Sequence, residues 1–380
     1  MKMRGVPQGN VEAKSLPTPE DRDVSAPWDE DNQAWWDWYV GLAHNPSLIA
    51  RQDRRGPAHS VERAAMDVAL EPDPRTVAPL RFDALAGELS TPYFVSAETI
   101  TRFRAEGYVK LPVVLSPGAV VALRRELVAV LETILGVALD GGSASPRRNQ
   151  TDPGPEPGRR FYSAEVIWLE NPIFRLFVLS PRIAKICSDL LGVDSIRLYH
   201  DNLLSKEPGC GRTPWHYDDH HFPLDTNDVV TAWIAAQAIP EAMGPLAFAR
   251  GMETWRLVAD VPFSKVDNSY DRRIADAFDR ADVDVDNSPF AVGDVSFHHN
   301  LSFHTAGANA TSISRCALAN TLFADGARVV DAPTMVSGNW RKFLPGVEPG
   351  GAAASPLNPI CWPAPEDWAR SEQGHRKDNG

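Results

Sequence analysis

The second half of the chain alternates short apolar runs with turn residues, and this pattern constrains the fold more than any other feature. Gly, Pro and Asn separate the runs, and no helical crossover is evident between them. Strands joined in this way are typical of antiparallel sandwiches and barrels. The predicted strands cover 196–204, the neighbourhood of His216, 229–238, 246–249, 295–299 and 315–323.

Helices are predicted ahead of these strands. An apolar stripe that starts after residue 96 ends at Gly107, a residue type that favours helix termination. Residues 108–115 are predicted as a strand, and Ser116 and Pro117 then cap and open a helix with apolar residues at helical spacing. Another helix is predicted over 181–191. The expected fold class is therefore mainly β with flanking helices.

The chain divides into three parts by composition. Residues 1–90 are rich in Pro, Asp, Glu and Arg and are predicted as an irregular, partly ordered N-terminal extension. This extension contains Trp28 and the aromatic run 35–39, which either docks on the core as a short helix or covers a pocket mouth. Residues 91–365 are predicted as a single domain, with a loop over 137–160, and 366–380 as a polar tail.

Charge and composition exclude several classes of protein. The 380 residues carry a formal net charge of -12 without a run of Lys or Arg, so no nucleic-acid partner is expected. No stretch of about 18 apolar residues is present, so no membrane span is predicted, and the start has no signal-peptide pattern. The four cysteines form no CxxC pair, which favours free thiols in a cytoplasmic protein. Composition says nothing about the oligomeric state.

A short motif points to a metal. His216 and Asp218 are spaced i, i+2, so on a strand both side chains would face the same side. A second histidine from another strand would complete two imidazoles and one carboxylate, the facial triad of non-haem Fe(II) oxygenases. Three later histidines are candidates for this position, and the residues by themselves leave the choice open: His298, His299 and His304.

Arg315 is a candidate anchor for an acidic cosubstrate. It opens a predicted strand on which the small residues Ala317 and Ala319 share its face. A guanidinium binds a carboxylate through two parallel hydrogen bonds. The alternative is an ordinary ion pair at the surface.

Together these segments resemble the phytanoyl-CoA dioxygenase family of Fe(II)/2-oxoglutarate oxygenases, over roughly residues 96–360. The evidence for this resemblance is the order of the four segments along the chain, since each segment alone is weak evidence. The matching stretches are 96–127, with a helix, a strand and a helix; 215–223, with WHYDDHHFP; 229–236, with Trp233; and 293–323, with the later histidines and Arg315.

The resemblance implies a double-stranded β-helix (jelly roll, cupin-like) with N-terminal helices. It implies His216, Asp218 and His304 as Fe(II) ligands. His304 is selected among the three histidines because the spacing between His304 and Arg315 matches the family pattern. It also implies that Arg315 holds the distal carboxylate of 2-oxoglutarate, that Trp233 lies near this cosubstrate, and that O2 is consumed.

The sequence departs from the family pattern in three places. A serine is common two residues after the distal histidine, but Ala306 stands here. Thr305 is a candidate cosubstrate contact instead, although on a regular strand it would face the other side. Residues 243–245 replace a usual polar pair, and no family lysine for the cosubstrate is assigned.

The implied activity is oxidation of an unactivated C–H bond, with hydroxylation as the default outcome. Desaturation, epoxidation and cyclisation are alternatives, and so is a jelly-roll protein that binds a metal or small molecule without redox turnover. A zinc hydrolase is less favoured, because it has no need of a carboxylate anchor such as Arg315. A halogenase is less favoured, because family halogenases leave open for chloride the position that Asp218 fills here. The expected substrate is a small, mostly apolar molecule of specialised metabolism. Candidate substrate contacts are Asn202, His220, His221, Phe222 and Trp255.

Overall fold

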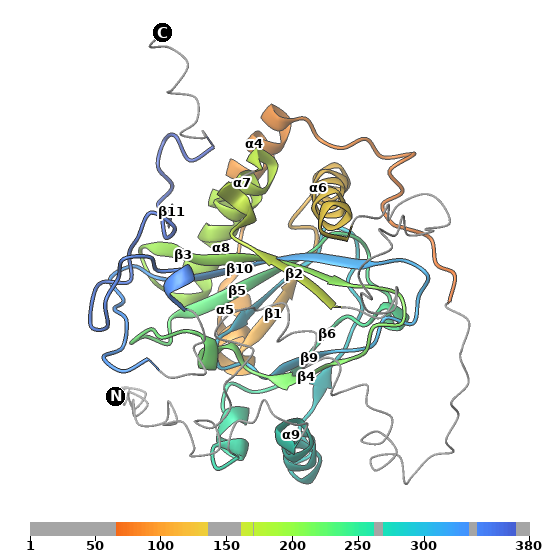
Figure 1. The fold of residues 1–380 in the computed structure, drawn as a ribbon. Helices are drawn as coiled ribbons and strands as arrows, with labels where there is room; N and C mark the ends of the chain where they lie inside the picture. The colour runs from red at the N-terminus through yellow and green to blue at the C-terminus, as the bar shows by residue number, and fades with distance from the viewer. Residues whose placement is uncertain (1–65, 136–160, 170, 262–268, 334–339, 370–380) are drawn as a thin grey trace, which may run out of the picture.

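Two antiparallel sheets form the centre of the protein (Figure 1). The structure, a computed structural model, describes residues 66–135, 161–169, 171–261, 269–333 and 340–369. The aromatic run near the N-terminus, the predicted 137–160 loop and most of the polar tail therefore lie outside the described residues. Among the described residues, no helix is both long and apolar enough to cross a membrane.

The larger sheet has the order β1-β8-β5-β10-β3-β11, with β2 also paired to β3. The smaller sheet has the order β4-β9-β6-β7. The strands of the larger sheet are β1 (Tyr108–Leu111), β2 (Phe161–Glu165), β3 (Ile196–Lys206), β5 (Val229–Ala235), β8 (Val295–His299), β10 (Arg315–Ala324) and β11 (Ile360–Trp362). Those of the smaller sheet are β4 (Thr213–His216), β6 (Leu246–Ala249), β7 (Val285–Asp286) and β9 (His304–Ala306).

Figure 1 shows most of the helices gathered on one side of the larger sheet, with the smaller sheet on its other side. The helices are α4 (Phe82–Ser90), α5 (Ala97–Glu106), α6 (Pro117–Leu135), α7 (Pro172–Val178), α8 (Pro181–Leu191) and α9 (Ser269–Arg280). Short 3-10 turns are η2 (Ile167–Leu169), η3 (Asp218–His221), η4 (Glu241–Met243), η5 (Thr254–Val258) and η7 (Trp340–Lys342). This is the expected fold class, a jelly roll with flanking helices.

Local chemistry explains where the predicted helices start and stop. The hydroxyl of Ser96 accepts a hydrogen bond from the Thr99 amide at the start of α5, and Gly107 ends that helix with a φ of 85°. Ser180 caps α8 in the same way, ahead of Pro181, and Gly192 ends it in the left-handed region. Both helices match their predicted boundaries.

The prediction missed α4, α7 and α9. The last of these lies between β6 and β7, where no helix was expected. Tyr270, Ile274 and Phe278 recur at i, i+4 and i+8 and pack with Trp215 and Phe303 beneath the smaller sheet. This helical spacing was present in the sequence, but the charged residues around it obscured the signal.

Two hydrophobic clusters define which surfaces are buried. One lies between the helices and the outer face of the larger sheet, and it includes Leu85 and Leu89 of α4. The other fills the space between the sheets, where Trp233 of the larger sheet meets Leu246 and Phe248 of the smaller one. The second cluster forms the interior of the barrel.

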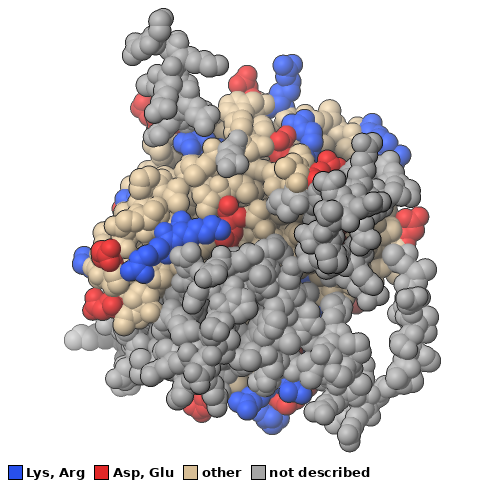
Figure 2. Space-filling model, viewed as in Figure 1, with Lys and Arg blue, Asp and Glu red and all other residues tan. Residues whose placement is uncertain are grey.

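On the face of the molecule that Figure 2 shows, Lys and Arg lie among Asp and Glu.

A buried carboxyl on β3 predicts a pH-dependent stability. Asp201 is 0% exposed, and burial raises its pKa from 3.8 to about 7, although the Ile167 amide donates to it over 2.9 Å. Its folded-state pKa lies above the unfolded value, so its stabilising contribution is complete below about pH 4 and declines as the pH rises to about 7. Asp201→Asn should therefore raise the free energy of unfolding at pH 8 by up to about 4 kcal/mol.

Urea unfolding at pH 8 and pH 4 would measure this effect. The gain should shrink to less than about 1 kcal/mol at pH 4, where Asp201 is protonated in the folded state and close to half protonated in the unfolded state. Asn320 lies opposite Asp201 on β10, and its Oδ1 has no partner among the described residues, so the new amide has an acceptor nearby. Asp83→Asn, at an exposed position in α4, is the control. An equal effect of Asp201→Asn at both pH values would contradict the prediction.

Candidate metal and cosubstrate site

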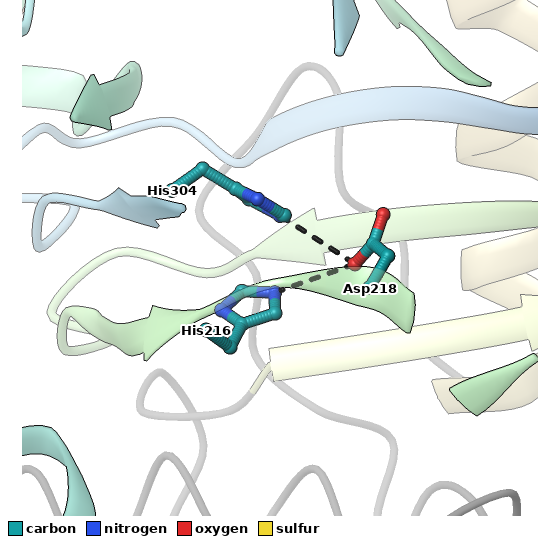
Figure 3. A group of neighbouring side chains, drawn as sticks. All are labelled: His216, Asp218 and His304. Carbon is teal, nitrogen blue, oxygen red and sulfur yellow. Dashed lines mark ion pairs between the residues drawn. The ribbon is translucent and has the colours of Figure 1, made fainter. Parts of the chain in front are cut away.

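Three side chains from two segments that lie far apart in the sequence converge inside the barrel (Figure 3). His216 ends β4 and His304 begins β9, and the two residues are partners across these strands. The Nε2 atoms of His216 and His304 lie 3.9 Å and 3.7 Å from Oδ1 of Asp218. Ligand atoms from these three residues all lie within 4.8 Å of one another, close enough to hold one metal ion.

Backbone geometry explains why Asp218 faces the histidines. The strand ends at His216, so the expected strand pair does not extend to Asp218, which begins η3. Tyr217 between them is extended, with φ of -130° and ψ of 151°. The side-chain alternation of a strand therefore continues for one more residue.

Hydrogen bonds orient both imidazoles. Nδ1 of His216 lies 2.8 Å from the Pro214 carbonyl, and Nδ1 of His304 lies 3.0 Å from the Ser302 carbonyl. Since a carbonyl only accepts, each Nδ1 carries the proton and each Nε2 presents its lone pair to the cluster. Burial lowers the pKa of both histidines, which favours the neutral form that binds metals.

The carboxylate of Asp218 is held in its ionised form. Burial alone would raise the pKa of Asp218, but the interactions with the surrounding histidines, including the hydrogen bond from His298, outweigh burial and lower it. Two neutral imidazoles and one carboxylate, clustered in a buried site, suit Fe(II). The donor set therefore fits this ion.

The competing histidines occupy different positions. His299 turns toward α5, where its ring centroid lies 6.3 Å from that of Phe103, and it accepts a hydrogen bond from the Leu301 amide. His298 faces the barrel interior beside Asp218, at a position the sequence did not assign to the site. It is not part of the cluster of three donor atoms.

Arg315 lies in the same interior and is 1% exposed. Its guanidinium lies over the Trp233 ring, 5.3 Å from the centroid, and Nη1 donates to the Gly244 carbonyl over 2.8 Å. It makes no ion pair with a described Asp or Glu, and Nε has no partner among the described residues. Burial lowers the pKa of Arg315 to about 10. A buried cation with an unused donor fits the carboxylate of an acidic cosubstrate.

Lys206 is a second buried cation, which the sequence reasoning missed. It is the Cα partner of Arg315 across β3 and β10, and it is 0% exposed. Its Nζ donates to the carbonyls of Gly211, Ala306 and Gly307 at 2.7, 3.2 and 2.8 Å, which ties the segment after His304 to β3. Burial, and then Arg315, lower its pKa. The predicted strand ended at Leu204. Side chains alternate between the two faces of a strand, so extending the prediction by two residues would have placed Lys206 on the same interior face as Leu204.

The residues beside His304 point in opposite directions. Ala306 faces the interior, so the position at which the family resemblance led us to expect a serine offers no hydroxyl. Thr305 faces the other side and is half-buried, and its hydroxyl donates to the Thr213 carbonyl. Thr305 therefore contributes to the pairing of β9 with β4, and we do not carry it into the proposed cosubstrate site.

The candidate substrate residues separate in the structure. Asn202, Ala319 and Trp233 are neighbours across three strands, and Oδ1 of Asn202 is buried without a partner among the described residues. Phe222 packs edge-on against Tyr199, with ring centroids 4.9 Å apart. His220 and His221 are half-buried in η3, the turn that begins at Asp218, and Trp255 packs in the cluster around α9.

Gly244 shapes the loop that holds Arg315. Its φ is +72°, and a Cβ at this position would lie 2.2 Å from the Gly307 carbonyl oxygen. Gly244→Ala should therefore destabilise the protein by more than the roughly 1–2 kcal/mol of left-handed strain alone, and it should raise KM for 2-oxoglutarate by moving the carbonyl that orients Arg315.

Thermal unfolding and cosubstrate titration would check this prediction. Gly346→Ala is a matched control, because its φ is +76° and an added Cβ would meet no atom within 4 Å. The control should show the backbone strain without the change in KM. Equal effects of the two substitutions on KM would contradict the role assigned to Gly244.

Comparisons with known proteins bear on the family and the fold of the chain. The sequence model of the family Phytanoyl-CoA dioxygenase (PhyH) matches residues 103–317. Among solved structures, SnoK, a non-haem alpha ketoglutarate dependent carbocyclase from nogalamycin biosynthesis, is 26% identical, with 71% of this chain and 99% of SnoK covered and a TM-score of 0.54. No curated protein sequence matches the chain.

Two further structures share the fold at lower identity. SnoN, a non-haem alpha ketoglutarate dependent epimerase from nogalamycin biosynthesis, is 22% identical, with 70% of this chain and 97% of SnoN covered and a TM-score of 0.51. EctD from S. alaskensis, solved with 2-oxoglutarate and 5-hydroxyectoine, is 18% identical, with 79% and 97% covered and a TM-score of 0.50.

A jelly roll with two imidazoles, a carboxylate and a buried arginine in its interior defines the class of non-haem Fe(II)/2-oxoglutarate oxygenases. The family match covers more than half of the chain. The protein belongs to the phytanoyl-CoA dioxygenase (PhyH) family.

Proposed function

We propose that the protein is a dioxygenase that uses Fe(II), 2-oxoglutarate and O2 to hydroxylate an unactivated C–H bond of a small, mostly apolar molecule in specialised metabolism. His216, Asp218 and His304 would hold the iron, and Arg315 the distal carboxylate of 2-oxoglutarate. One observation carries the proposal: a donor cluster of two buried histidines and a half-buried aspartate shares its barrel with a buried guanidinium that lacks a carboxylate partner among the described residues.

The chain supplies geometry and an enclosed environment. When bound, Fe(II) with 2-oxoglutarate and O2 supplies C–H oxidation coupled to release of succinate and CO2. The carbonyls of Pro214 and Ser302 keep the two imidazoles in the tautomer that presents Nε2. Arg315 and the Trp233 ring beneath it fix the far end of the cosubstrate, and the apolar side chains between the sheets limit access of water.

The substrate class rests on the apolar interior and on the solved relative. SnoK acts in nogalamycin biosynthesis as a carbocyclase, so oxidative cyclisation is the second outcome that we propose to test. Asn202, whose Oδ1 has no partner among the described residues, is the proposed polar contact, whereas Phe222 offers an apolar one. The four cysteines are buried thiols rather than a disulfide framework, which suits a reducing, cytoplasmic setting. We propose residues 91–365 as the oxygenase domain.

A coupled assay tests the proposal. The protein is incubated with Fe(II), 2-oxoglutarate, ascorbate and a panel of polycyclic and aliphatic metabolites, and succinate and product mass are measured. Succinate with the gain of one oxygen atom in a product supports hydroxylation, and the loss of two hydrogens supports cyclisation or desaturation. Metal binding without succinate formation across the panel would favour a non-redox binding protein.

A further inference from the structure

A third histidine lies in the barrel beside the donor cluster. His298 is 2% exposed, and its Nε2 lies 3.3 Å from Oδ2 of Asp218. It belongs to β8, where it is the Cα partner of Thr231 on β5 and of Tyr108 on β1. Its ring centroid lies 4.5 Å from that of His304. None of the proposed catalytic roles uses this side chain.

The two oxygens of Asp218 have different surroundings. Oδ1 faces the Nε2 atoms of His216 and His304, as Figure 3 shows. Oδ2 instead accepts a hydrogen bond from the Thr231 hydroxyl, over 3.2 Å, and lies beside Nε2 of His298. One oxygen is therefore directed at the metal position, and the protein holds the other.

The donors to Oδ2 can be assigned. A carboxylate oxygen only accepts, so Nε2 of His298 carries a proton and donates it. Thr231 gives its hydroxyl hydrogen to Asp218, so the hydroxyl of Thr321, 3.0 Å away, donates to Thr231 in turn. Asp218 thus stands at the end of a chain of oriented hydrogen bonds that starts on β10.

Packing alone does not explain His298. Its Nδ1 is buried without a partner among the described residues, and leaving a buried polar atom unpaired is costly. A phenylalanine would fill the same place beside the Phe248 ring, 5.5 Å away between centroids, without that cost. The useful feature of histidine here is the Nε2–H group directed at Oδ2.

We propose that His298, with Thr231, is a positioning residue that keeps Asp218 bound to the metal through one oxygen only. A carboxylate that binds through both oxygens takes two coordination positions, whereas one oxygen leaves three positions free beside the two histidines. 2-Oxoglutarate and O2 would need these free positions. This inference rests on the proposed function, because it takes Asp218 as an iron ligand.

The test measures binding rather than turnover. Kd values for Mn(II), and for 2-oxoglutarate on the Mn(II)-loaded protein, are determined by calorimetry in the full chain. The charge-transfer absorption of the Fe(II) and 2-oxoglutarate complex is recorded without oxygen. His298→Phe removes the donor and keeps the ring, His298→Gln can restore an N–H donor, and Thr231→Val removes the other donor to the same oxygen. His299→Phe, on the opposite face of β8, is the matched control.

His298→Phe should weaken 2-oxoglutarate binding about tenfold or more, change metal binding less, and reduce the absorption band. Thr231→Val should act in the same direction, and His298→Gln should recover most of the affinity. The inference is overturned if His298→Phe leaves 2-oxoglutarate affinity within about twofold of wild type, or weakens metal and cosubstrate binding equally. A wild-type protein that binds neither would instead overturn the proposed function.

Discussion

Replacing Asp218 with alanine is expected to abolish metal-dependent activity. Asp218 is the only carboxylate in the described donor cluster, and its loss leaves two neutral imidazoles to hold a dication. Substitution of residues that merely support a ligand costs about 10–100-fold in metal affinity or activity, so removal of a ligand should cost at least about 100-fold. Succinate formation from 2-oxoglutarate measures the loss of turnover.

Thermal unfolding separates this effect from a loss of fold. Ligand at 100 times its Kd stabilises a protein by about 2.7 kcal/mol, so Mn(II) should raise the Tm of wild type and leave that of Asp218→Ala unchanged. The metal-free proteins should unfold cooperatively at similar temperatures. Asp228→Ala, at an exposed position just before β5, is the control and should retain the metal-induced shift. A full metal-induced shift in Asp218→Ala would contradict the ligand assignment.

Replacing Arg315 with methionine is expected to raise KM for 2-oxoglutarate without loss of stability. Each charge-assisted hydrogen bond contributes about 1.5–3 kcal/mol, so losing a two-bond contact should weaken binding by roughly 100-fold to 10,000-fold. The side chain is buried with one hydrogen bond, to Gly244, and no ion pair among the described residues. Removing the charge of Arg315 relieves the cost of burying it, and this gain offsets the lost stacking on Trp233. The free energy of unfolding should therefore change by less than about 1 kcal/mol.

Arg315→Lys provides the informative comparison. It keeps the charge but loses the planar fork, so its KM should lie between those of wild type and Arg315→Met. Metal binding in the absence of cosubstrate should be the same in all three proteins, because Arg315 is not part of the metal cluster. An unchanged KM in Arg315→Met would remove Arg315 from the proposed cosubstrate site. Calorimetric titration of 2-oxoglutarate into the Mn(II)-loaded protein gives the same comparison without turnover.

The elements that the sequence predicted well depend on neighbours in the chain. The boundaries of α8 follow from a serine cap, a proline and a glycine within one short segment. The predicted strands at 246–249 and 295–299 coincide with β6 and β8 because apolar runs between turn residues are local signals. In contrast, α9 was missed, since the charged residues around its apolar stripe obscured the helical spacing, and the structure shows that stripe packed under β4.

The interior polar groups required the strand pairing. The register of β10 against β3 places Lys206 opposite Arg315. Neither segment, taken alone, predicts that these two basic side chains share a buried space. His298 and His299 are adjacent in sequence, yet the pleat of β8 turns one toward Asp218 and the other toward Phe103. A strand pattern shows that neighbours face opposite sides, but it does not show which side is the interior.

The sequence by itself determined the fold class and the residue types of the candidate site, because both depend on short-range spacing and on motif order along the chain. The tertiary structure decided which atoms face one another: the separate surroundings of the two Asp218 oxygens, the Arg315 Nε that lacks a partner among the described residues, and the hydrogen bonds of Lys206. These relations join residues up to about a hundred positions apart, and only sheet register and packing bring them within hydrogen-bonding distance.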